Sequence, residues 1–323
     1  DFPYVDHIVR GYGEVAMVDI VKGKETDHII IGKEPENLFM FPAYELIKPE
    51  TYHRRIGGNI SLPLLTSRGC PYHCNFCGLE QIHKILKYGV KMAPVDVVIS
   101  QIEIIKSMGI DSINFQDDIF TLKPKRLFKI LDAIKEMNMS FRCMGRAGYD
   151  KEETYRKLSE CGIDQISWGI ESGSQYMLDR MNKQVKVQDN YNVIKWAKRY
   201  GITSRAFFVI GFPGETKETL EETKRFIINS DVDQYFISTF VPYPGTNVGD
   251  NPEKFGILNM SDDLNNYYQV SKDGTGGMTT DTKWLSRYEF RELELELREW
   301  LRINKPFKGV KQEYEEKMYG GNE

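Results

Sequence analysis

The segment Thr66-Ser-Arg-Gly-Cys-Pro-Tyr-His-Cys-Asn-Phe-Cys-Gly78 carries three of the five cysteines of the chain, Cys70, Cys74 and Cys77. An odd, clustered set of cysteines argues against a disulfide framework. Three thiolates on one short loop can face a common point, and thiolates are the usual ligands of iron–sulfur clusters. With three thiolates, one iron of a four-iron cluster keeps an open position, which is typical of a catalytic site. A zinc site is the alternative, but His73 is too close to Cys74 in sequence to complete a tetrahedron comfortably.

From residue 61 onward, short apolar runs alternate with stretches of helical spacing, as in successive βα units. Parallel strands require crossover helices, so six units predict an α/β fold with a parallel sheet curved into a partial or complete barrel. A complete barrel of the familiar kind would need eight units. The predicted strands are Leu62–Thr66, Ser112–Gln116, Phe141–Met144, Gln165–Ile170, Ala206–Ile210 and Gln234–Val241. The predicted helices begin near Pro94, Pro124, Asp150 and Thr216, and a long polar helical region ends at Gly201.

The two flanks differ from this core. Residues 1–60 combine glycine-ended turns with short apolar runs, which predicts a small β-rich lead-in without a core of its own. Residues 61–246 form the predicted barrel, and residues 247–323 form a C-terminal extension with a helix from about Ser286 to Ile303 that should dock on the barrel. Within the core, Asp150 and Glu153 have the spacing of a capping box and predict a helix start there.

Composition narrows the class of protein. The 323 residues are 28% charged and 41% hydrophobic, with 43 basic and 47 acidic side chains and a net charge of −4. These values are typical of a globular protein and give no electrostatic basis for nucleic-acid binding, which requires excess Lys and Arg. No stretch approaches the roughly 20 apolar residues of a membrane span. We therefore expect a cytoplasmic protein that acts on a small-molecule or peptide substrate.

The cysteine segment resembles the CxxxCxxC signature of radical S-adenosylmethionine (radical SAM) enzymes, including the aromatic Phe76 before the last cysteine. The resemblance implies a partial (β/α)6 barrel, which agrees with the six units counted above. It also implies a [4Fe-4S] cluster held by Cys70, Cys74 and Cys77, with S-adenosylmethionine bound at the open iron. One electron then cleaves the sulfonium to give a 5'-deoxyadenosyl radical, which abstracts a hydrogen atom from the substrate. A reductase such as flavodoxin or ferredoxin is the implied partner.

Further positions of the family fall at the predicted strand ends, where a parallel barrel binds its ligand. The resemblance assigns Asp117 and Asp118 to the segment that receives the amino group of S-adenosylmethionine, although an FxDDxF sequence replaces the usual Gly-Gly-Glu. This departure favours a role for the backbone. Glu171 would bind the ribose or methionine end of the cofactor, and Gly211 would lie in the adenine-binding turn. Arg205 could pair with the methionine carboxylate, because a guanidinium suits bidentate carboxylate recognition.

The opening segment Phe2–Glu14 resembles the last βα segment of a cobalamin-binding domain and the passage from it into the radical SAM domain, which points to the cobalamin-associated branch of the family. No DxHxxG motif supplies a histidine to cobalt. Two interpretations follow: a fragment of a longer cobalamin-dependent enzyme, which we favour, or a descendant that has lost the cofactor. The first predicts methylation at carbon, and the second predicts deoxygenation, epimerisation or cyclisation. An iron–sulfur electron carrier is a remote alternative. Cys161 and Cys143 are too few for a second cluster and are expected to pack in the core, although Cys143 could face the barrel interior.

Overall fold

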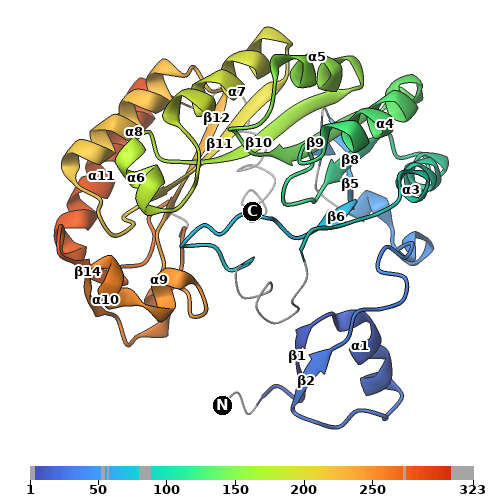
Figure 1. The fold of residues 1–323 in the computed structure, drawn as a ribbon, viewed down its shortest axis with the longest axis horizontal. Coiled ribbons are helices and arrows are strands. Elements are labelled where there is room, and N and C mark those ends of the chain that lie inside the picture. The colour runs from blue at the N-terminus through green and yellow to red at the C-terminus, as the bar shows by residue number, and fades with distance from the viewer. Residues whose placement is uncertain (1–3, 52–54, 57, 80–88, 272–273, 307–323) are drawn as a thin grey trace, which may run out of the picture.

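The computed structural model describes residues 4–51, 55–56, 58–79, 89–271 and 274–306. Its central element is a six-stranded sheet in the order β12-β11-β10-β9-β8-β5, in which every neighbouring pair is parallel. The sheet curves, and helices follow its outer face (Figure 1). The strands are β5 (Leu62–Leu64), β8 (Ser112–Phe115), β9 (Ser140–Gly145), β10 (Ile163–Glu171), β11 (Thr203–Ile210) and β12 (Gln234–Thr239).

Crossover helices connect consecutive strands of this sheet, as the sequence predicts. The helix after β8 starts at Pro124, where the ring fixes a helical φ and the missing N–H would have no helical partner. The helices of the core are α3 (Val95–Ser107), α4 (Pro124–Ile134), α5 (Glu152–Glu160), α6 (Gln175–Arg180), α7 (Val187–Arg199) and α8 (Lys217–Asn229). The predicted polar helical region before Gly201 thus consists of two helices. Short 3-10 helices lie at Tyr44–Leu46, Pro49–Thr51, Lys135–Met137 and Leu264–Asn266.

The hydrophobic core lies between the sheet and its helices. Along β11, Ala206, Phe208 and Ile210 are buried on the helix side, while Phe207 and Val209 are half-buried on the concave side. This alternation follows from the two-residue period of a strand. The sheet ends at β5 and β12 and stays open there in the described part of the chain. The expected α/β fold with a partial six-unit barrel is therefore confirmed.

The predicted capping box at Asp150 is wrong. Helix α5 has Lys151 as its N-cap residue, without a side-chain hydrogen bond. Asp150 instead accepts a hydrogen bond of 3.0 Å from the Tyr155 hydroxyl. Burial raises the pKa of Asp150 to about 7, although its hydrogen bonds with Tyr155 and Thr121 act in the opposite direction. The tertiary environment of this carboxyl overrides the local capping pattern.

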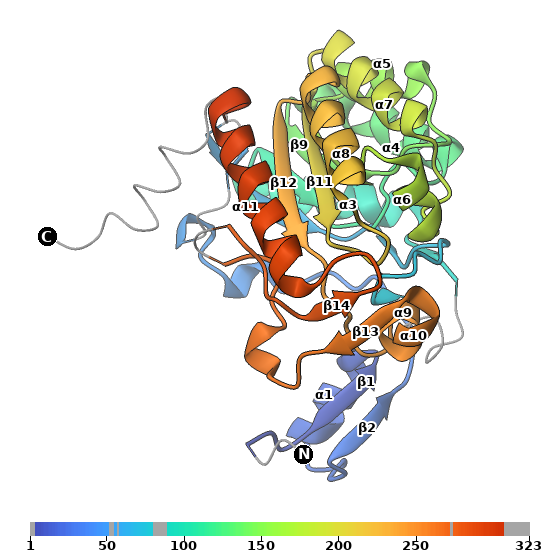
Figure 2. The same ribbon diagram turned by 90° about the vertical axis from the view of Figure 1, so that its left-hand side faces the viewer.

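The N-terminal unit comprises β1 (Ile8–Gly11), α1 (Gly13–Val21) and β2 (Ile29–Gly32), with the two strands parallel. The lead-in contains short strands and a helix, so it is less β-rich than the apolar runs alone predict, and β1 followed by α1 agrees with the resemblance to a βα segment. The unit lies on the side toward which the strands of the main sheet point (Figure 2). After it, β3 (Arg55–Ile56) and β4 (Asn59–Ile60) form an antiparallel pair, and β3 lies against β8 and β9.

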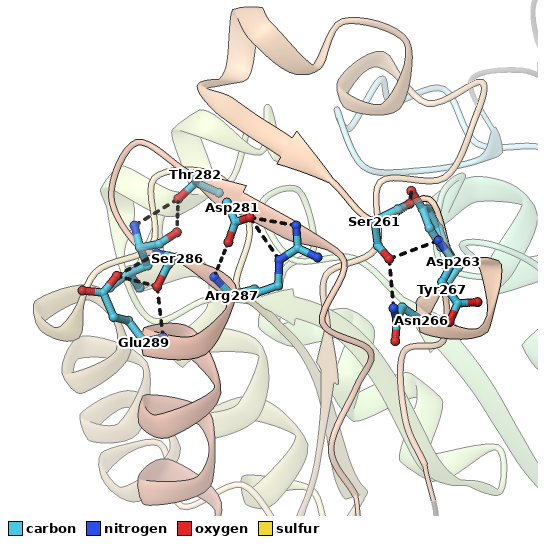
Figure 3. Close-up of polar contacts among 10 residues, drawn as sticks. Ser261, Asp263, Asn266, Tyr267, Asp281, Thr282, Ser286, Arg287 and Glu289 are labelled. Atoms are coloured by element: carbon cyan, nitrogen blue, oxygen red, sulfur yellow. Dashed lines mark hydrogen bonds and ion pairs between the residues drawn. The ribbon is translucent and has the colours of Figure 1, made fainter.

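The C-terminal extension runs from the end of β12 to a long helix that packs along α8 and β12 (Figure 2). This helix begins after Ser286, which forms a capping box with Glu289, as the polar-to-apolar change in the sequence predicts. Asp281 accepts two hydrogen bonds from the Arg287 guanidinium, at 3.0 and 2.7 Å, and fixes the helix start (Figure 3). The remaining elements are α9 (Asn247–Asp250), α10 (Pro252–Phe255), β13 (Ile257–Met260), β14 (Thr280–Thr282) and α11 (Arg287–Asn304).

A buried carboxylate docks α11 on the sheet. Glu294 is fully buried, accepts a hydrogen bond of 2.7 Å from the Thr239 hydroxyl at the end of β12, and lies 2.8 Å from Arg298. A charged group is buried without penalty only when it is paired and hydrogen-bonded.

No helix within the described ranges has both the length and the apolar character that crossing a membrane requires.

Candidate functional site

The cysteine loop lies at the carboxyl edge of the sheet. It follows β6 (Ser67–Arg68), which pairs antiparallel with β7 (Lys91–Met92) just beyond the first strand of the sheet. All three cysteines are free thiols; Cys74 is buried, while Cys70 and Cys77 are half-buried. Burial raises the pKa of the Cys70 and Cys77 thiols above the ordinary value. Metal binding would therefore have to displace their protons.

Two adjacent carboxylates after β8 hold the start of this loop. Asp117 is fully buried and accepts hydrogen bonds from the Thr66 N–H at 3.1 Å, the Thr66 hydroxyl at 2.8 Å and the Ser67 hydroxyl. Asp118 accepts a hydrogen bond of 3.1 Å from the Gly69 N–H, immediately before Cys70. Both side chains are thus engaged with the start of the loop.

Asn75, inside the CxxxCxxC segment, ties the loop to two distant segments. Its N–H donates to the Met181 carbonyl at 2.9 Å, and its side-chain amide donates to the Arg180 carbonyl at 2.8 Å. On the other side, its carbonyl accepts from the Val248 N–H at 3.1 Å and its amide oxygen accepts from Asn247 at 2.8 Å. The sequence analysis missed this residue, because its partners lie more than 100 positions away.

Glu171 ends β10, as predicted, and its backbone is strained. Its φ is +64°, and the register of β10 against β11 shifts between Gly169 and Glu171. Left-handed φ values are uncommon for residues other than glycine and often occur at functional sites. The carboxylate is buried and lies 2.6 Å from the Nζ atom of Lys183. Lys183 follows α6 and is a second residue that the sequence analysis missed.

Gly211 follows β11 with a φ of +80°. A Cβ atom there would lie 2.6 Å from the Phe290 ring of α11, so packing within the chain also requires glycine. The buried Glu215 accepts a hydrogen bond of 3.1 Å from the Gly211 N–H and another from the Thr219 hydroxyl. Burial raises the pKa of Glu215 to about 7, against the effect of these hydrogen bonds.

The Gly211 turn also meets the cysteine loop. Phe76 packs edge-to-face on Phe212, with ring centroids 6.4 Å apart. The structure therefore brings the predicted residue Phe76 next to the predicted turn. A small pocket lies on the other side of this turn, against the C-terminal extension, and its lining includes Gly211, Glu215, Phe240, Met278, Thr280 and Phe290.

The structure does not bring Arg205 to the strand ends where the other predicted residues lie. This residue is the third of β11 and is level with Gln234, the first residue of β12, so it lies toward the amino ends of the strands. The cysteine loop lies at the opposite edge. The guanidinium packs on aromatic rings of the concave face, 4.6 Å from the centroid of Phe236. A position at the start of a strand places a side chain far from the carboxyl edge, where parallel barrels bind their ligands.

The donor set fits an iron–sulfur cluster better than a single ion. Among the described residues, no three His, Cys, Asp or Glu side chains are gathered closely enough for one metal ion. Thiolates of a four-iron cluster bind separate irons, so three free thiols on one loop suit such a cluster.

The other two cysteines, Cys143 and Cys161, are buried within the main hydrophobic core, and Cys143 shares the helix side of β9 with Phe141. Cys143 therefore does not face the barrel interior.

Comparison with known proteins agrees with this geometry. The sequence profile of the radical SAM superfamily matches residues 64–227, about half of the chain, from the first strand to helix α8. The matched region includes the cysteine loop, Glu171 and the Gly211 turn. The chain belongs to the radical SAM superfamily. It is accordingly a radical SAM enzyme, whose superfamily uses a [4Fe-4S] cluster and S-adenosylmethionine.

Relatives extend the likeness beyond the profile. A Pyrococcus horikoshii protein named as an uncharacterized methyltransferase is 31% identical to this radical SAM protein over 76% of the chain and 57% of its own length. The structure of the radical SAM methyltransferase TsrM from Kitasatospora setae superposes with a TM-score of 0.64 at 15% identity, covering 92% of this chain and 67% of TsrM. The cobalamin-dependent radical SAM enzyme OxsB gives a TM-score of 0.64 at 16% identity, covering 90% of this chain and 49% of OxsB. The two solved structures establish a shared fold.

The chain spans 44 to 61% of the length of three curated relatives that it matches. The activity, substrate and partners of the whole protein are therefore matters for proposal.

Proposed function

We propose that this radical SAM protein is the catalytic core of a cobalamin-dependent enzyme that methylates carbon in a small-molecule or peptide substrate. The observation that carries the proposal is the loop of three free thiols at the carboxyl edge, with Glu171 and the Gly211 turn on neighbouring strand ends. When bound, the cluster and S-adenosylmethionine supply a one-electron cleavage that starts hydrogen abstraction from carbon.

Different residues of the site bind the cluster and the separate parts of S-adenosylmethionine. Cys70, Cys74 and Cys77 hold the cluster through their thiolates. Glu171 binds the ribose or methionine end of S-adenosylmethionine, and its ion pair with Lys183 orients the carboxylate. Asp117 and Asp118 hold the cysteine loop and leave their backbone for the amino group of the cofactor. Phe76 and the Gly211 turn form the adenine side. The electron comes from a reductase of the flavodoxin or ferredoxin type.

The N-terminal unit supports the cobalamin part of the proposal. Its parallel strand–helix–strand arrangement is the repeating unit of doubly wound α/β folds. Apolar side chains remain exposed on it, including Met17 at 58%, Val21 at 78% and Ile31 at 59%. Exposed apolar groups gathered in one small unit are typical of a surface that packs against another domain or a ligand. The relative from Pyrococcus is named a methyltransferase, and OxsB binds cobalamin, which favours a cobalamin-binding layer here.

The first test measures the cluster and the cleavage of S-adenosylmethionine. After anaerobic reconstitution with iron and sulfide, the wild type should show cluster absorbance and, with dithionite and S-adenosylmethionine, form 5'-deoxyadenosine. Cys74→Ala should lose both, while Cys161→Ala, at a buried cysteine away from the loop, should keep both. Full iron content in Cys74→Ala would reject the ligand assignment. A wild type that carries a cluster but forms no 5'-deoxyadenosine would be an electron carrier.

The second test concerns cobalamin. A corrin is a large ring, and burying it needs a larger surface than one strand–helix–strand unit offers. The purified chain should therefore fail to retain hydroxocobalamin on gel filtration, as followed by its visible absorbance. The product of the complete reading frame should retain it in stoichiometric amount. If that product turns over substrate without cobalamin, the enzyme belongs to the cobalamin-independent group that deoxygenates, epimerises or cyclises its substrate.

A further inference from the structure

Arg146 is a buried cation beside the cysteine loop. It is the residue after β9, at the carboxyl edge of the sheet, and only 5% of it is exposed. A guanidinium is costly to bury unless its N–H groups and its charge have partners. Its contacts therefore indicate what this position does.

The guanidinium bridges two segments of the site. On one side, its Cζ atom lies 3.6 Å from the centroid of the Tyr72 ring, and its Nη1 atom donates a hydrogen bond to Cys74 Sγ at 3.8 Å. On the other side, its Nη2 atom donates to the carbonyl of Lys183. The side chain of Lys183 in turn holds Glu171. Arg146 thus connects the thiol of Cys74 with the turn that carries the ion pair of Glu171.

A cation at this position has a specific electrostatic consequence. A cluster held by Cys74 becomes more negative by one charge when it is reduced. A buried positive charge that donates an N–H to one of its sulfur ligands stabilises the reduced form more than the oxidised form, and hydrogen bonds to cluster sulfurs are a main determinant of potential. The effect is strong here because the low exposure of Arg146 limits screening by water.

We propose that Arg146 is a positioning residue that raises the reduction potential of the cluster through its hydrogen bond to Cys74 and holds the cysteine loop in register with the Lys183–Glu171 pair. The inference rests on the proposed function, because it requires that the loop hold a cluster. It adds a determinant of the potential that the cysteines alone do not provide.

The test is a potentiometric titration of the reconstituted protein followed by electron paramagnetic resonance. Arg146→Gln removes the charge but keeps an N–H donor for the Lys183 carbonyl. It should take up iron like the wild type, and its ratio of reduced to oxidised cluster at a fixed potential should fall about tenfold, which is about 59 mV for a one-electron couple. Arg146→Lys keeps the charge and should lie between Arg146→Gln and the wild type.

Arg126→Met is the matched control. Arg126 also braces the cysteine segment, because it donates hydrogen bonds to the carbonyls of Thr66 at 3.0 Å and Ala93 at 2.9 Å. Among the described residues, Arg126 has no hydrogen bond to a cysteine sulfur. The control should lose stability and leave the potential of the cluster unchanged. An Arg146→Gln variant with a full cluster and the wild-type potential overturns the inference and leaves the proposed function intact. A wild type that forms no cluster overturns both.

A second measurement does not depend on the folding of a variant. Wild-type protein made with arginine labelled with ¹⁵N in the guanidinium should show a ¹⁵N hyperfine coupling in the reduced state, since an N–H···S contact delocalises spin onto the nitrogen. The Arg126→Met protein should show the same coupling. If the labelled wild type carries a reduced cluster and shows no ¹⁵N coupling, Arg146 does not contact the cluster and the inference is wrong.

Discussion

The main sheet and the N-terminal unit use the same building block with different results. Both consist of parallel strands joined by a helix. In the main sheet, Trp168 and Phe208 are completely buried, because neighbouring units share one core. In the N-terminal unit, Met17 and Val21 project into solvent. A parallel sheet needs cover on both faces and several strands before its apolar side chains are buried, so one isolated unit cannot stabilise itself. The number of adjacent units decides whether the motif has a core.

The largest expected effect of a substitution follows from this difference. Phe208→Ala removes a ring that lies within the core of the main sheet and packs edge-to-face on Phe226. The free energy of unfolding should fall by about 3–5 kcal/mol, the usual cost of such a cavity. Met17→Ala, in the exposed face of α1, should change it by less than about 0.5 kcal/mol. Urea unfolding followed by circular dichroism measures both. Equal losses in the two variants would show that the N-terminal unit has a core of its own.

An effect of intermediate size is expected in the pH dependence of the free energy of unfolding. It comes from buried carboxyl groups, which we expect to act only in the main-sheet region. Burial raises the pKa of Asp150 to about 7 in the folded protein, compared with an ordinary value of 3.8. The folded protein holds this proton more tightly than the unfolded chain does, so the contribution of Asp150 to the free energy of unfolding is fully present below pH about 4. This contribution is lost as the pH rises through about 7. Glu215, with a pKa also raised to about 7, acts in the same direction.

In Asp150→Asn, an amide that is neutral at every pH replaces the carboxyl and imitates its protonated form. The variant should lose less stability than the wild type between pH 4 and pH 7, by about 1–3 kcal/mol in the free energy of unfolding. Thermal unfolding across this range is the measurement, and Asp262→Asn, at an exposed position, is the control that should keep the wild-type slope. A steeper decline in Asp150→Asn would contradict the sign of the effect.

The smallest effect concerns the contact between the two regions. Glu14 of α1 lies 2.6 Å from Arg68 of β6, and Glu34 lies 3.3 Å from Lys91, the cross-strand partner of Arg68 in β7. These side chains are partly exposed, so each ion pair should contribute about 0.2–1 kcal/mol. A double-mutant cycle with Glu14→Gln and Arg68→Gln measures the coupling in unfolding. A coupling above about 2 kcal/mol would mean that the two regions unfold as one body.

The sequence predicted the sheet well because strong local signals coincide with its elements. Apolar runs locate all six strands to within about three residues at each end. Proline at Pro124 and serine at Ser286 mark helix starts through chemistry that acts within one turn. The residue pattern did not locate helix α1, which only the resemblance to a βα segment implied, and it missed the two-residue strands β6 and β7. Helix α1 exposes apolar side chains and so lacks a clear amphipathic pattern, and two residues are too short to show a period.

The candidate site was predictable only in part. The cysteines and Glu171 carry motifs in the local sequence and lie at strand ends as expected. Arg146, Lys183 and Asn75 carry none, because their roles depend on partners brought together by the barrel. For Arg205, the chemistry suits a carboxylate, but its place in the strand lies toward the amino ends and away from the edge that carries the cysteine loop. The type of a residue can be read directly from the sequence. The end of the strand at which its side chain lies can be assigned only when the exact strand boundaries are known.

The hydrogen bonds of Asn75 have a consequence for the order of events during synthesis. The three cysteines leave the ribosome early, but Asn247, one of the groups that hold their loop, lies 172 residues later. At about 5–20 residues per second, the ribosome needs roughly 10–30 s to cover that distance. Throughout this interval the nascent loop has free thiols and lacks the part of its bracing that comes from Asn247 and Val248. The fully braced loop, into which a cluster would be inserted, can therefore form only after Asn247 and Val248 have been made.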